Sequence, residues 1–108
     1  MSKGYVYILL CADGSYYTGS TKYPELRIQQ HKSGLGAKHT KKNLPVRLVY
    51  MEEFMSIEQA FRREKQIQGW SRMKKEALIN FKHHELPQLS KNKLHQPSAG
   101  FLGVASTG

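Results

Sequence analysis

The chain has 108 residues, enough for one domain with a single modest core. Its 17 Lys and Arg residues against 8 Asp and Glu give a formal charge of +9, and 39% of its residues are hydrophobic. This composition favours a folded globule over a disordered chain, and the positive field indicates a polyanionic partner, nucleic acid before an anionic membrane. A charge that serves only solubility is the alternative.

Membrane insertion and disulfide bonding are both disfavoured by the sequence. The longest apolar run, residues 6–12, is far shorter than the roughly 20 residues of a membrane-spanning helix, and no signal-peptide pattern opens the chain. Cys11 is the single cysteine, which excludes a disulfide framework and a Cys-rich zinc site. Its apolar neighbours favour a core residue over a nucleophile. We therefore expect a cytoplasmic protein with no membrane partner.

The first third of the chain predicts a β-hairpin followed by a helix. Residues 5–11 and 16–20 are rich in β-prone side chains, and the Asp-Gly dipeptide between them tolerates the positive φ of a tight turn. We expect a helix from Pro24, whose missing N–H is harmless in the first turn, to about Ser33. Gly34 then ends it.

The middle of the chain predicts a loop, a strand and a second helix. Residues 34–45 combine two glycines with three lysines and are expected to form a loop. A third strand, residues 46–54, follows a proline. The next helix begins with the capping-box pattern Ser56-x-x-Gln59 and runs to about Gln68, before a glycine.

A last helix is expected from a cap at Ser71 to about His83. Its apolar stripe would consist of Met73, Ala77, Leu78 and Phe81. Periodicity then stops, so we expect a domain of residues 1–85 and a flexible C-terminal tail of residues 86–108. The order β-β-α-β-α-α predicts an α+β fold, a small three-stranded antiparallel sheet flanked by helices.

Glu64 is an unusual residue for its position. It falls within the apolar stripe of its helix, which is formed by Ile57, Ala60, Phe61 and Ile67. A carboxylate there is unfavourable unless it is paired. One interpretation is a salt bridge with Arg27, Arg62 or Lys65. The other is a metal ligand or general base at a cleft, since carboxylate oxygen is a natural ligand for Mg²⁺.

Two other groups of residues could take part in catalysis or phosphate binding. Arg27 and His31 are four residues apart on one helix face, and they combine a phosphate-binding guanidinium with a side chain that titrates near neutrality. An ordinary amphipathic surface is the alternative for this pair. Tyr7 and Tyr17 would be core or rim aromatics if taken alone. Gly19, just after Tyr17, lets backbone or substrate come close.

Taken together, these residues resemble a known family. The order and spacing of six residues resemble those of the GIY-YIG nuclease superfamily. These residues are Tyr7, Tyr17, Gly19, Arg27, His31 and Glu64. Its first signature appears as "YVY" at residues 5–7, its second as "YTG" at residues 17–19, and "RREKQI" supplies the glutamate. The segments "YVYILLCADGSYYTGST", "GAKHT", "LVYMEEF" and "REKQIQGWSRMKKEALI" resemble a branch of small, stand-alone bacterial members. The resemblance covers roughly residues 4–82.

The resemblance implies phosphodiester hydrolysis with one divalent metal ion, Mg²⁺ or Mn²⁺. Glu64 would hold this ion, and Arg27 would neutralise the scissile phosphate in the transition state. Tyr17 would be the general base that activates water, while Tyr7 would shape the same pocket and hydrogen-bond to water or phosphate. These assignments make the protein an enzyme with its site between strands and helices.

Two further residues take supporting roles in this scheme. His31 would either relay the proton from Tyr17 or bind phosphate. Gly19 would keep the floor of the pocket open.

The chain also departs from the family pattern. The Gly and Ile of the first signature are Tyr5 and Val6 here. Tyr23 stands where many relatives have a capping Asp or Asn, so the first helix is expected to start less firmly. His39 stands where a tyrosine is expected, and whether it adds to the site is open.

Nucleic-acid binding is expected from basic side chains, because the chain shows no separate targeting domain. The candidates are Lys38, Lys41, Lys42, Arg62, Arg63, Arg72, Lys74 and Lys75. Such charges bind phosphates without reading sequence.

The leading hypothesis is a metal-dependent endonuclease that acts on DNA with low sequence specificity, in DNA repair or processing. A non-catalytic nucleic-acid-binding module is one alternative. A subunit that needs a protein partner for targeting is another.

Overall fold

The computed structural model describes residues 2–82, and the predicted tail, residues 86–108, lies outside them. The elements in chain order are β1 (Gly4–Leu10), β2 (Tyr16–Thr21), α1 (Pro24–Lys32), α2 (Lys38–Lys42), β3 (Arg47–Phe54), α3 (Ile57–Gln68) and α4 (Arg72–Lys82). They fall into two units, with β1 to α3 in residues 1–69 and α4 in the second. None of the helices described is long and apolar enough to cross a membrane.

The three strands form one antiparallel sheet in the order β2-β1-β3, which confirms the predicted α+β architecture. The central strand β1 places Tyr7 opposite Gly19 of β2 and Met51 of β3. The predicted turn is present: Gly14 has a φ of +87°, and the Asp13 carboxylate accepts a 3.0 Å hydrogen bond from the Ser15 amide. The hairpin therefore fixes the register that puts a glycine across from Tyr7.

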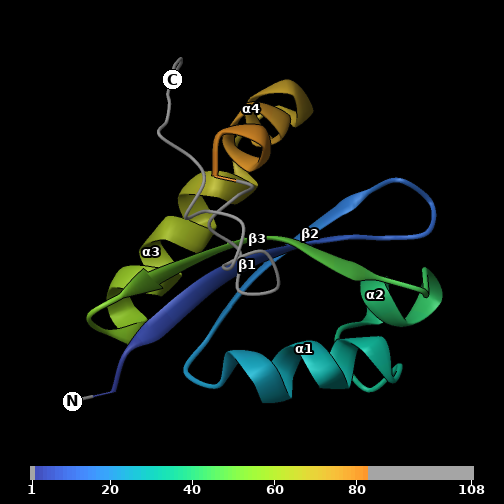
Figure 1. Ribbon diagram of the computed structural model, residues 1–108, viewed down its shortest axis with the longest axis horizontal. Helices are drawn as coiled ribbons and strands as arrows, with labels where there is room; N and C mark the ends of the chain where they lie inside the picture. Colours follow the sequence, from blue (N-terminus) through green and yellow to red (C-terminus); the bar gives the residue numbers. More distant parts are fainter. Residues whose placement is uncertain (1, 83–108) are drawn as a thin grey trace, which may run out of the picture. The chain divides into compact units, whose positions relative to one another are not determined.

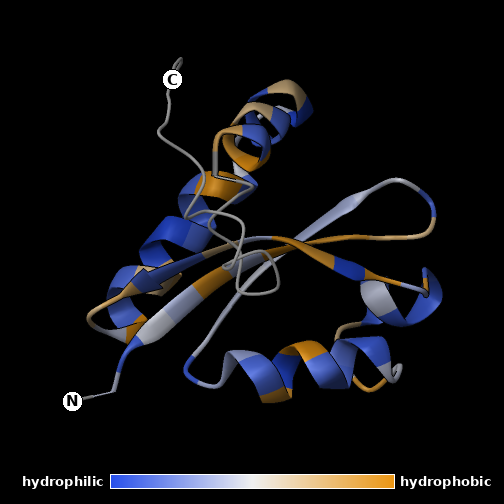
Figure 2. Cartoon of the chain, in the orientation of Figure 1, coloured by the Kyte–Doolittle hydropathy of each residue, from blue (hydrophilic) through white to orange (hydrophobic). Residues whose placement is uncertain are grey.

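Helices cover both faces of the sheet (Figure 1), so β1 is buried on both sides. Val6 and Ile8 point to the face covered by α3, which packs against β1 and β2. The opposite face, towards α1 and α2, carries a core of Tyr7, Leu9, Cys11 and Val46, with Tyr17, Ile28 and Leu48 packed against it. Figure 2 shows the matching concentration of hydrophobic residues in the middle of the sheet. Cys11 is a core residue, as predicted.

The helix ends follow the predicted signals closely. α1 begins at Pro24 and finishes just before Gly34, which has a φ of +80°. At the start of α3 the Ser56 hydroxyl accepts a 3.2 Å hydrogen bond from the Gln59 amide. The Gln59 side chain bonds back to the amide of Met55, at 3.1 Å, rather than to that of Ser56. The capping box is thus present, with its return bond displaced by one residue.

The predicted loop at residues 34–45 is wrong in its middle, because α2 occupies residues 38–42. This single helical turn is held by hydrogen bonds that periodicity does not reveal. The hydroxyl of Thr40 donates to the carbonyl of Ala37 at 3.0 Å, and the side chain of Asn43 donates to that of His39 at 2.8 Å. Thr40 is fully buried, so tertiary packing decides the local structure here.

In the second unit, α4 has the predicted cap but not the predicted stripe. The Lys74 amide donates to the Ser71 hydroxyl at 3.2 Å. Met73 and Phe81 are 80% and 54% exposed, whereas Ile79, at 7%, is the buried apolar residue. Apolar residues occur on several sides of this helix, so their spacing alone did not identify the buried face.

We expect Ile67→Ala to lower the free energy of unfolding by about 2–5 kcal/mol, because it empties a fully buried position on α3. Denaturant unfolding measures this loss. Phe61→Ala on the same helix is the control, since Phe61 is 50% exposed. A Phe61→Ala loss as large as that of Ile67→Ala would contradict the packing described above.

Candidate active site

The centre of the site is a chain of buried hydrogen bonds. The Tyr7 hydroxyl lies 2.8 Å from Nε2 of His31, and Nδ1 of His31 lies 2.8 Å from the hydroxyl of Thr40. Thr40 gives its own proton to the carbonyl of Ala37, so it must accept one from Nδ1 of His31. His31 is therefore the Nδ1–H tautomer, and its Nε2 accepts the proton of Tyr7. The direction of every bond in this chain is fixed.

Two glycines make room for the two rings. A Cβ atom on Gly19 would lie 2.6 Å from Cζ of Tyr7, and one on Gly36 would lie 2.8 Å from Cε1 of His31. Neither ring could keep its place against a side chain at these positions. Gly19 is thus a structural part of the site. Gly36 and Thr40 were missed in the sequence, where the GLGAKHT segment indicated only a flexible loop.

Burial and nearby charges shift both titrating groups of the chain. Burial lowers the pKa of His31 to about 4, and the charge of Arg27 contributes to this shift. Burial raises the pKa of Tyr7 to about 12, with Tyr17 and Glu64 adding to the rise and Arg27 opposing it. His31 is therefore neutral near pH 7. Tyr17, Arg27 and Glu64 are therefore near enough to act electrostatically on Tyr7.

Glu64 reaches the site from α3 and is held by neutral donors. One carboxylate oxygen accepts a 2.6 Å hydrogen bond from the Ser20 hydroxyl, and the other accepts a 2.8 Å bond from the Gln68 side chain. Among residues 2–82, none of the ion pairs includes Glu64, so the salt-bridge interpretation fails. Glu64 is half-buried and borders an apolar stripe narrower than predicted, because Phe61 is exposed.

The chemistry of this carboxylate fits Mg²⁺. This cation prefers oxygen ligands, usually takes one or two carboxylates, and completes its octahedral shell with water and substrate phosphate. Glu64 offers two oxygens that are turned towards uncharged donors and are not neutralised by a cationic side chain. Ser20 and Gln68 would orient the carboxylate.

The structure changes the role expected of His31. Both ring nitrogens are engaged, with Tyr7 and Thr40, so neither can take a proton from Tyr17. Its side chain is also fully buried, so a phosphate could reach it only after the site opens. Tyr17 contacts His31 through its ring instead, with centroids 5.1 Å apart. His31 therefore bonds to the hydroxyl of Tyr7 and only packs against the ring of Tyr17, and its role as proton relay or phosphate ligand stays a prediction.

His39 and Arg27 complete the wall. The His39 ring stacks on Tyr17 with centroids 6.3 Å apart and a 17° interplanar angle, so His39 lies beside the site although its nitrogen bonds to Ser15. Arg27 is half-buried and donates a 3.1 Å hydrogen bond to the Gln30 side chain. Its hydrogen bond and charge oppose the rise in the pKa of Tyr7, so Arg27 acts on the tyrosine hydroxyl as a cation.

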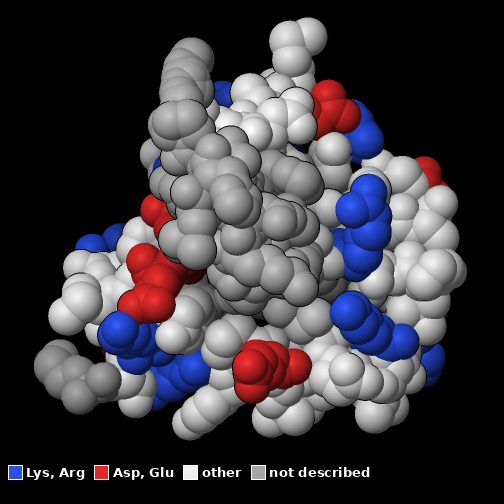
Figure 3. Space-filling view, in the orientation of Figure 1, with Lys and Arg blue, Asp and Glu red and all other residues white. Residues whose placement is uncertain are grey.

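The structure brings only some of the predicted basic residues together. Lys38, Lys41 and Lys42 are exposed on the short helix α2, next to the site wall. On the face drawn in Figure 3, basic groups lie in several places with acidic groups among them. Among the described residues that are visible there, charge is therefore not gathered into one patch.

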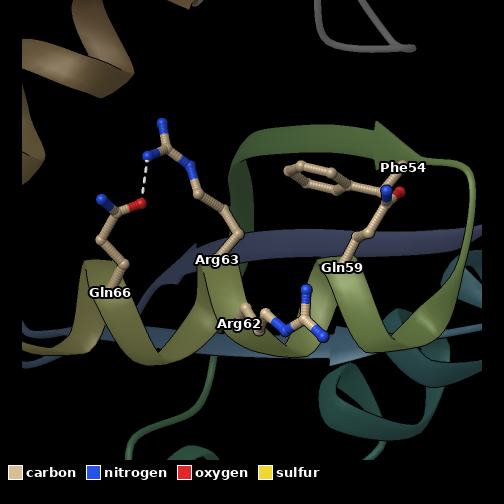
Figure 4. A pocket seen from close by; sticks show the side chains of 5 residues that line it. All are labelled: Phe54, Gln59, Arg62, Arg63 and Gln66. Atoms are coloured by element: carbon tan, nitrogen blue, oxygen red, sulfur yellow. Dashed lines mark hydrogen bonds between the residues drawn. The ribbon is translucent and has the colours of Figure 1, made fainter.

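Arg62 and Arg63 leave α3 in different directions and line a shallow groove (Figure 4) with Phe54, Gln59 and Gln66. Arg63 donates to Glu52 at 3.2 Å and to Gln66 at 2.6 Å, so its charge is already engaged, whereas Arg62 is exposed.

The remaining three basic candidates lie on α4, in the second unit. Arg72 pairs with Glu76 at 3.1 Å, and the Lys74 ammonium lies 4.3 Å from the centre of the Trp70 ring. Lys75 is half-buried.

The comparison with protein families agrees with this arrangement of residues. The model of the GIY-YIG catalytic domain matches residues 3–77. The chain belongs to the GIY-YIG family. The expected family is confirmed.

Small bacterial proteins are similar over most of this chain. The UPF0213 protein SSP2268 of Staphylococcus saprophyticus is 50% identical over 80 residues, which are 74% of this chain and 98% of that protein. The solution NMR structure of the UPF0213 protein BH0048 from Bacillus halodurans has a TM-score of 0.53 at 46% identity and covers 85% of this chain and 96% of its own. That of EF2693 from E. faecalis has a TM-score of 0.53 at 36% identity and covers 77% and 88%.

We expect the stability of the protein to fall as pH falls from about 7 towards 4. Folded His31 has a pKa of about 4 against 6.5 for a free histidine, so the unfolded chain binds the extra proton in this range. This one group should add a slope of up to about 1.4 kcal/mol per pH unit.

Denaturant unfolding at several pH values measures the slope, with His31→Gln as the comparison because it cannot titrate. The variant should show a shallower dependence between pH 7 and about 5, before most carboxylates protonate. Equal slopes for the two proteins would mean that His31 is not held neutral by the fold.

Proposed function

We propose that this protein is a metal-dependent endonuclease that hydrolyses phosphodiester bonds in DNA with low sequence specificity. The observation that carries the proposal is the oriented Thr40–His31–Tyr7 chain, which gives a tyrosine a built-in proton acceptor inside a GIY-YIG domain. Arg27 and Glu64 lie close enough to Tyr7 to shift its pKa in opposite directions. A base, a cation and a carboxylate that is not paired with a cationic side chain are groups that can support phosphodiester hydrolysis.

Tyr7 is better placed than Tyr17 to act as the general base. As Tyr7 takes a proton from the attacking water, its own proton would pass to Nε2 of His31 along the 2.8 Å hydrogen bond. Burial and the charge of Arg27 disfavour a protonated His31, so this transfer requires the phosphate to engage Arg27 first. Arg27 favours the phenolate through its charge. The water oxygen then bonds to phosphorus, the bond to the leaving oxygen breaks, and solvent protonates that oxygen.

Substrate must uncover the base, because Tyr7 is only 1% exposed. Arg27 lies beside its hydroxyl and is half-buried. A scissile phosphate attracts this guanidinium into a charge-assisted contact, which opens the hydroxyl to water. Arg27 would then neutralise the charge that develops on the phosphate.

Glu64 would hold Mg²⁺ or Mn²⁺, with Ser20 and Gln68 orienting its carboxylate. When bound, such an ion withdraws negative charge from phosphate oxygens and from the leaving oxygen. DNA affinity comes from the exposed lysines of α2 and from Arg62, which contact phosphates and read no bases.

A non-catalytic nucleic-acid-binding module is the second candidate. The observation in its favour is the near-complete burial of Tyr7 and His31, which leaves water little access to the base. A cleavage panel of linear, nicked, branched and single-stranded DNA and of RNA, with Mg²⁺ or Mn²⁺, separates the two functions. Binding without cutting under every condition would support the module.

Removal of the Tyr7 hydroxyl should abolish most cleavage. Tyr7→Phe keeps the ring over Gly19 and should lower the cleavage rate by about 10²-fold or more, with DNA affinity retained. Tyr17→Phe, which also loses one hydroxyl, is the matched variant and should cut faster than Tyr7→Phe. A Tyr7→Phe protein that cuts at the normal rate would exclude the relay, and a larger loss in Tyr17→Phe would move the base to Tyr17.

Loss of the Glu64 charge should weaken metal use. Glu64→Gln keeps the size of the side chain, so we expect a sharp fall in activity with partial rescue at high Mg²⁺ or Mn²⁺ concentration. Titration of cleavage against metal concentration measures this. Glu58→Gln, an exposed position on the same helix, should leave the metal dependence unchanged. Equal metal dependence in both variants would contradict metal binding at Glu64.

DNA affinity should fall steeply and log-linearly with salt and differ little between sequences. Replacing the three exposed lysines of α2 with Gln should flatten the log–log slope by about 0.9 for each phosphate that is no longer neutralised. Fluorescence anisotropy with short duplexes provides the measurement. Lys3→Gln is the control, because Lys3 already pairs with Glu53 at 2.6 Å. A flat salt response, or a strong preference for one sequence, would argue against phosphate-dominated binding.

A further inference from the structure

Three potential metal ligands converge beside the β1–β2 turn, away from Glu64 in the sequence. They are the thiol of Cys11, the carboxylate of Asp13 and the imidazole of His39, and one donor atom from each lies within 4.8 Å of the others. Among residues 2–82, this is the one group of three or more His, Cys, Asp or Glu side chains whose donor atoms lie this close together. The function proposed above uses none of them as a ligand.

The fold brings these ligands together through backbone hydrogen bonds. The Cys11 amide donates to the Ser15 carbonyl at 2.9 Å, and the Gly14 amide donates to the Cys11 carbonyl at 2.9 Å, which closes the turn around Asp13. The Ala12 amide donates to the Asn43 carbonyl at 2.9 Å and so ties the turn to the end of α2. His39, in the first turn of α2, is thereby held beside the turn.

The three ligands also differ usefully in exposure. Cys11 is buried, whereas Asp13 and His39 are exposed, so a cation can enter from solvent and meet the thiol from the open side. The Ser15 hydroxyl now lies between two of the ligands, 2.6 Å from the Asp13 carboxylate and 2.7 Å from Nε2 of His39. Rotation of this one hydroxyl would leave both groups free to turn towards a cation.

We propose that Cys11, Asp13 and His39 form a binding site for a divalent cation of the Zn²⁺ type, with water at the fourth position. Zn²⁺ accepts sulfur, nitrogen and carboxylate oxygen in a tetrahedral shell, and three protein ligands plus water is a common arrangement. Mg²⁺ is excluded by its preference for oxygen ligands. On binding, the thiol releases its proton to solvent and the thiolate bonds to the metal.

This site stands independently of the proposed nuclease activity. A cation held here would cross-link the hairpin turn to α2 without touching Glu64. Its position next to Tyr17, which stacks on His39, makes it a clamp on one wall of the candidate active site. The test therefore measures metal binding and requires no cleavage.

Titration of the intact protein with Co²⁺, a spectroscopic stand-in for Zn²⁺, provides the direct readout. Thiolate ligation produces a sulfur-to-cobalt charge-transfer band, and tetrahedral geometry gives intense visible absorption. Because Cys11 is the single cysteine of the chain, a charge-transfer band can arise only there. We expect both absorptions to saturate at one Co²⁺ per chain and to disappear when Zn²⁺ is added. Absence of the charge-transfer band on titration with Co²⁺ would overturn the proposal.

Variants then assign the ligands by competition of Zn²⁺ with a chromophoric chelator. Asp13→Asn, His39→Gln and Cys11→Ala each remove a direct ligand, so each should weaken affinity by at least the roughly 10–100-fold that loss of an outer-shell partner costs. Ser15→Ala should retain affinity, because it only frees the two exposed ligands. Circular dichroism of the metal-free variants establishes that each one is folded.

Binding by other histidines is the competing explanation. A His83→Gln, His84→Gln, His95→Gln triple variant is the control, and these three residues lie outside the part of the chain that the structure describes. Unchanged Zn²⁺ affinity in the triple variant supports the site at the turn. A loss there together with normal affinity in His39→Gln would overturn it.

Discussion

The hydrogen bond between the Tyr7 hydroxyl and Nε2 of His31 is the contact on which the rest of the site depends. For the two rings to meet, one must lie over Gly19 and the other against Gly36, so both positions exclude a side chain. The second nitrogen of His31 needs an acceptor, which Thr40 supplies from α2. Four consecutive elements, β1, β2, α1 and α2, are therefore positioned around a single imidazole. An unsatisfied partner in this buried chain would cost about 1–3 kcal/mol.

The same bond determines where positive charge can reside. His31 is buried and keeps one proton, on Nδ1, so it can accept from Tyr7 but contributes no charge towards a bound phosphate. That task falls to Arg27, one helical turn earlier, whose charge acts on both rings. A charged imidazole beside the free guanidinium would be repelled by it and would lose its hydration, so His31 can take the proton of Tyr7 only while a phosphate neutralises Arg27.

The sequence predicted most of the fold because local chemistry decides it. The turn before Ser15, the end of α1 and the Ser56 cap depend on backbone conformations and short-range bonds that particular residue types favour. The wrong expectations concern longer-range contacts. α2 has no periodicity in five residues and is fixed by the buried Thr40, and the partner of His31 proved to be Tyr7 rather than Tyr17. No spacing rule in the sequence could choose between the two tyrosines.

Tyr17 connects the candidate active site with the ligands at the turn. Tyr7 in β1 and Cys11, which directly follows β1, belong to the same core, and four residues of extended chain separate them by about 13 Å, so one cation cannot serve both ends. Tyr17 pairs with Leu9 between them, and its ring contacts His31 on one side and His39 on the other. The ring, not the hydroxyl, makes both contacts. A change that removes only the hydroxyl of Tyr17 should therefore leave its ring contacts with both histidines intact. Loss of the ring would remove the stacking partner of His39, whereas His31 would stay in place because its hydrogen bonds to Tyr7 and Thr40 hold it.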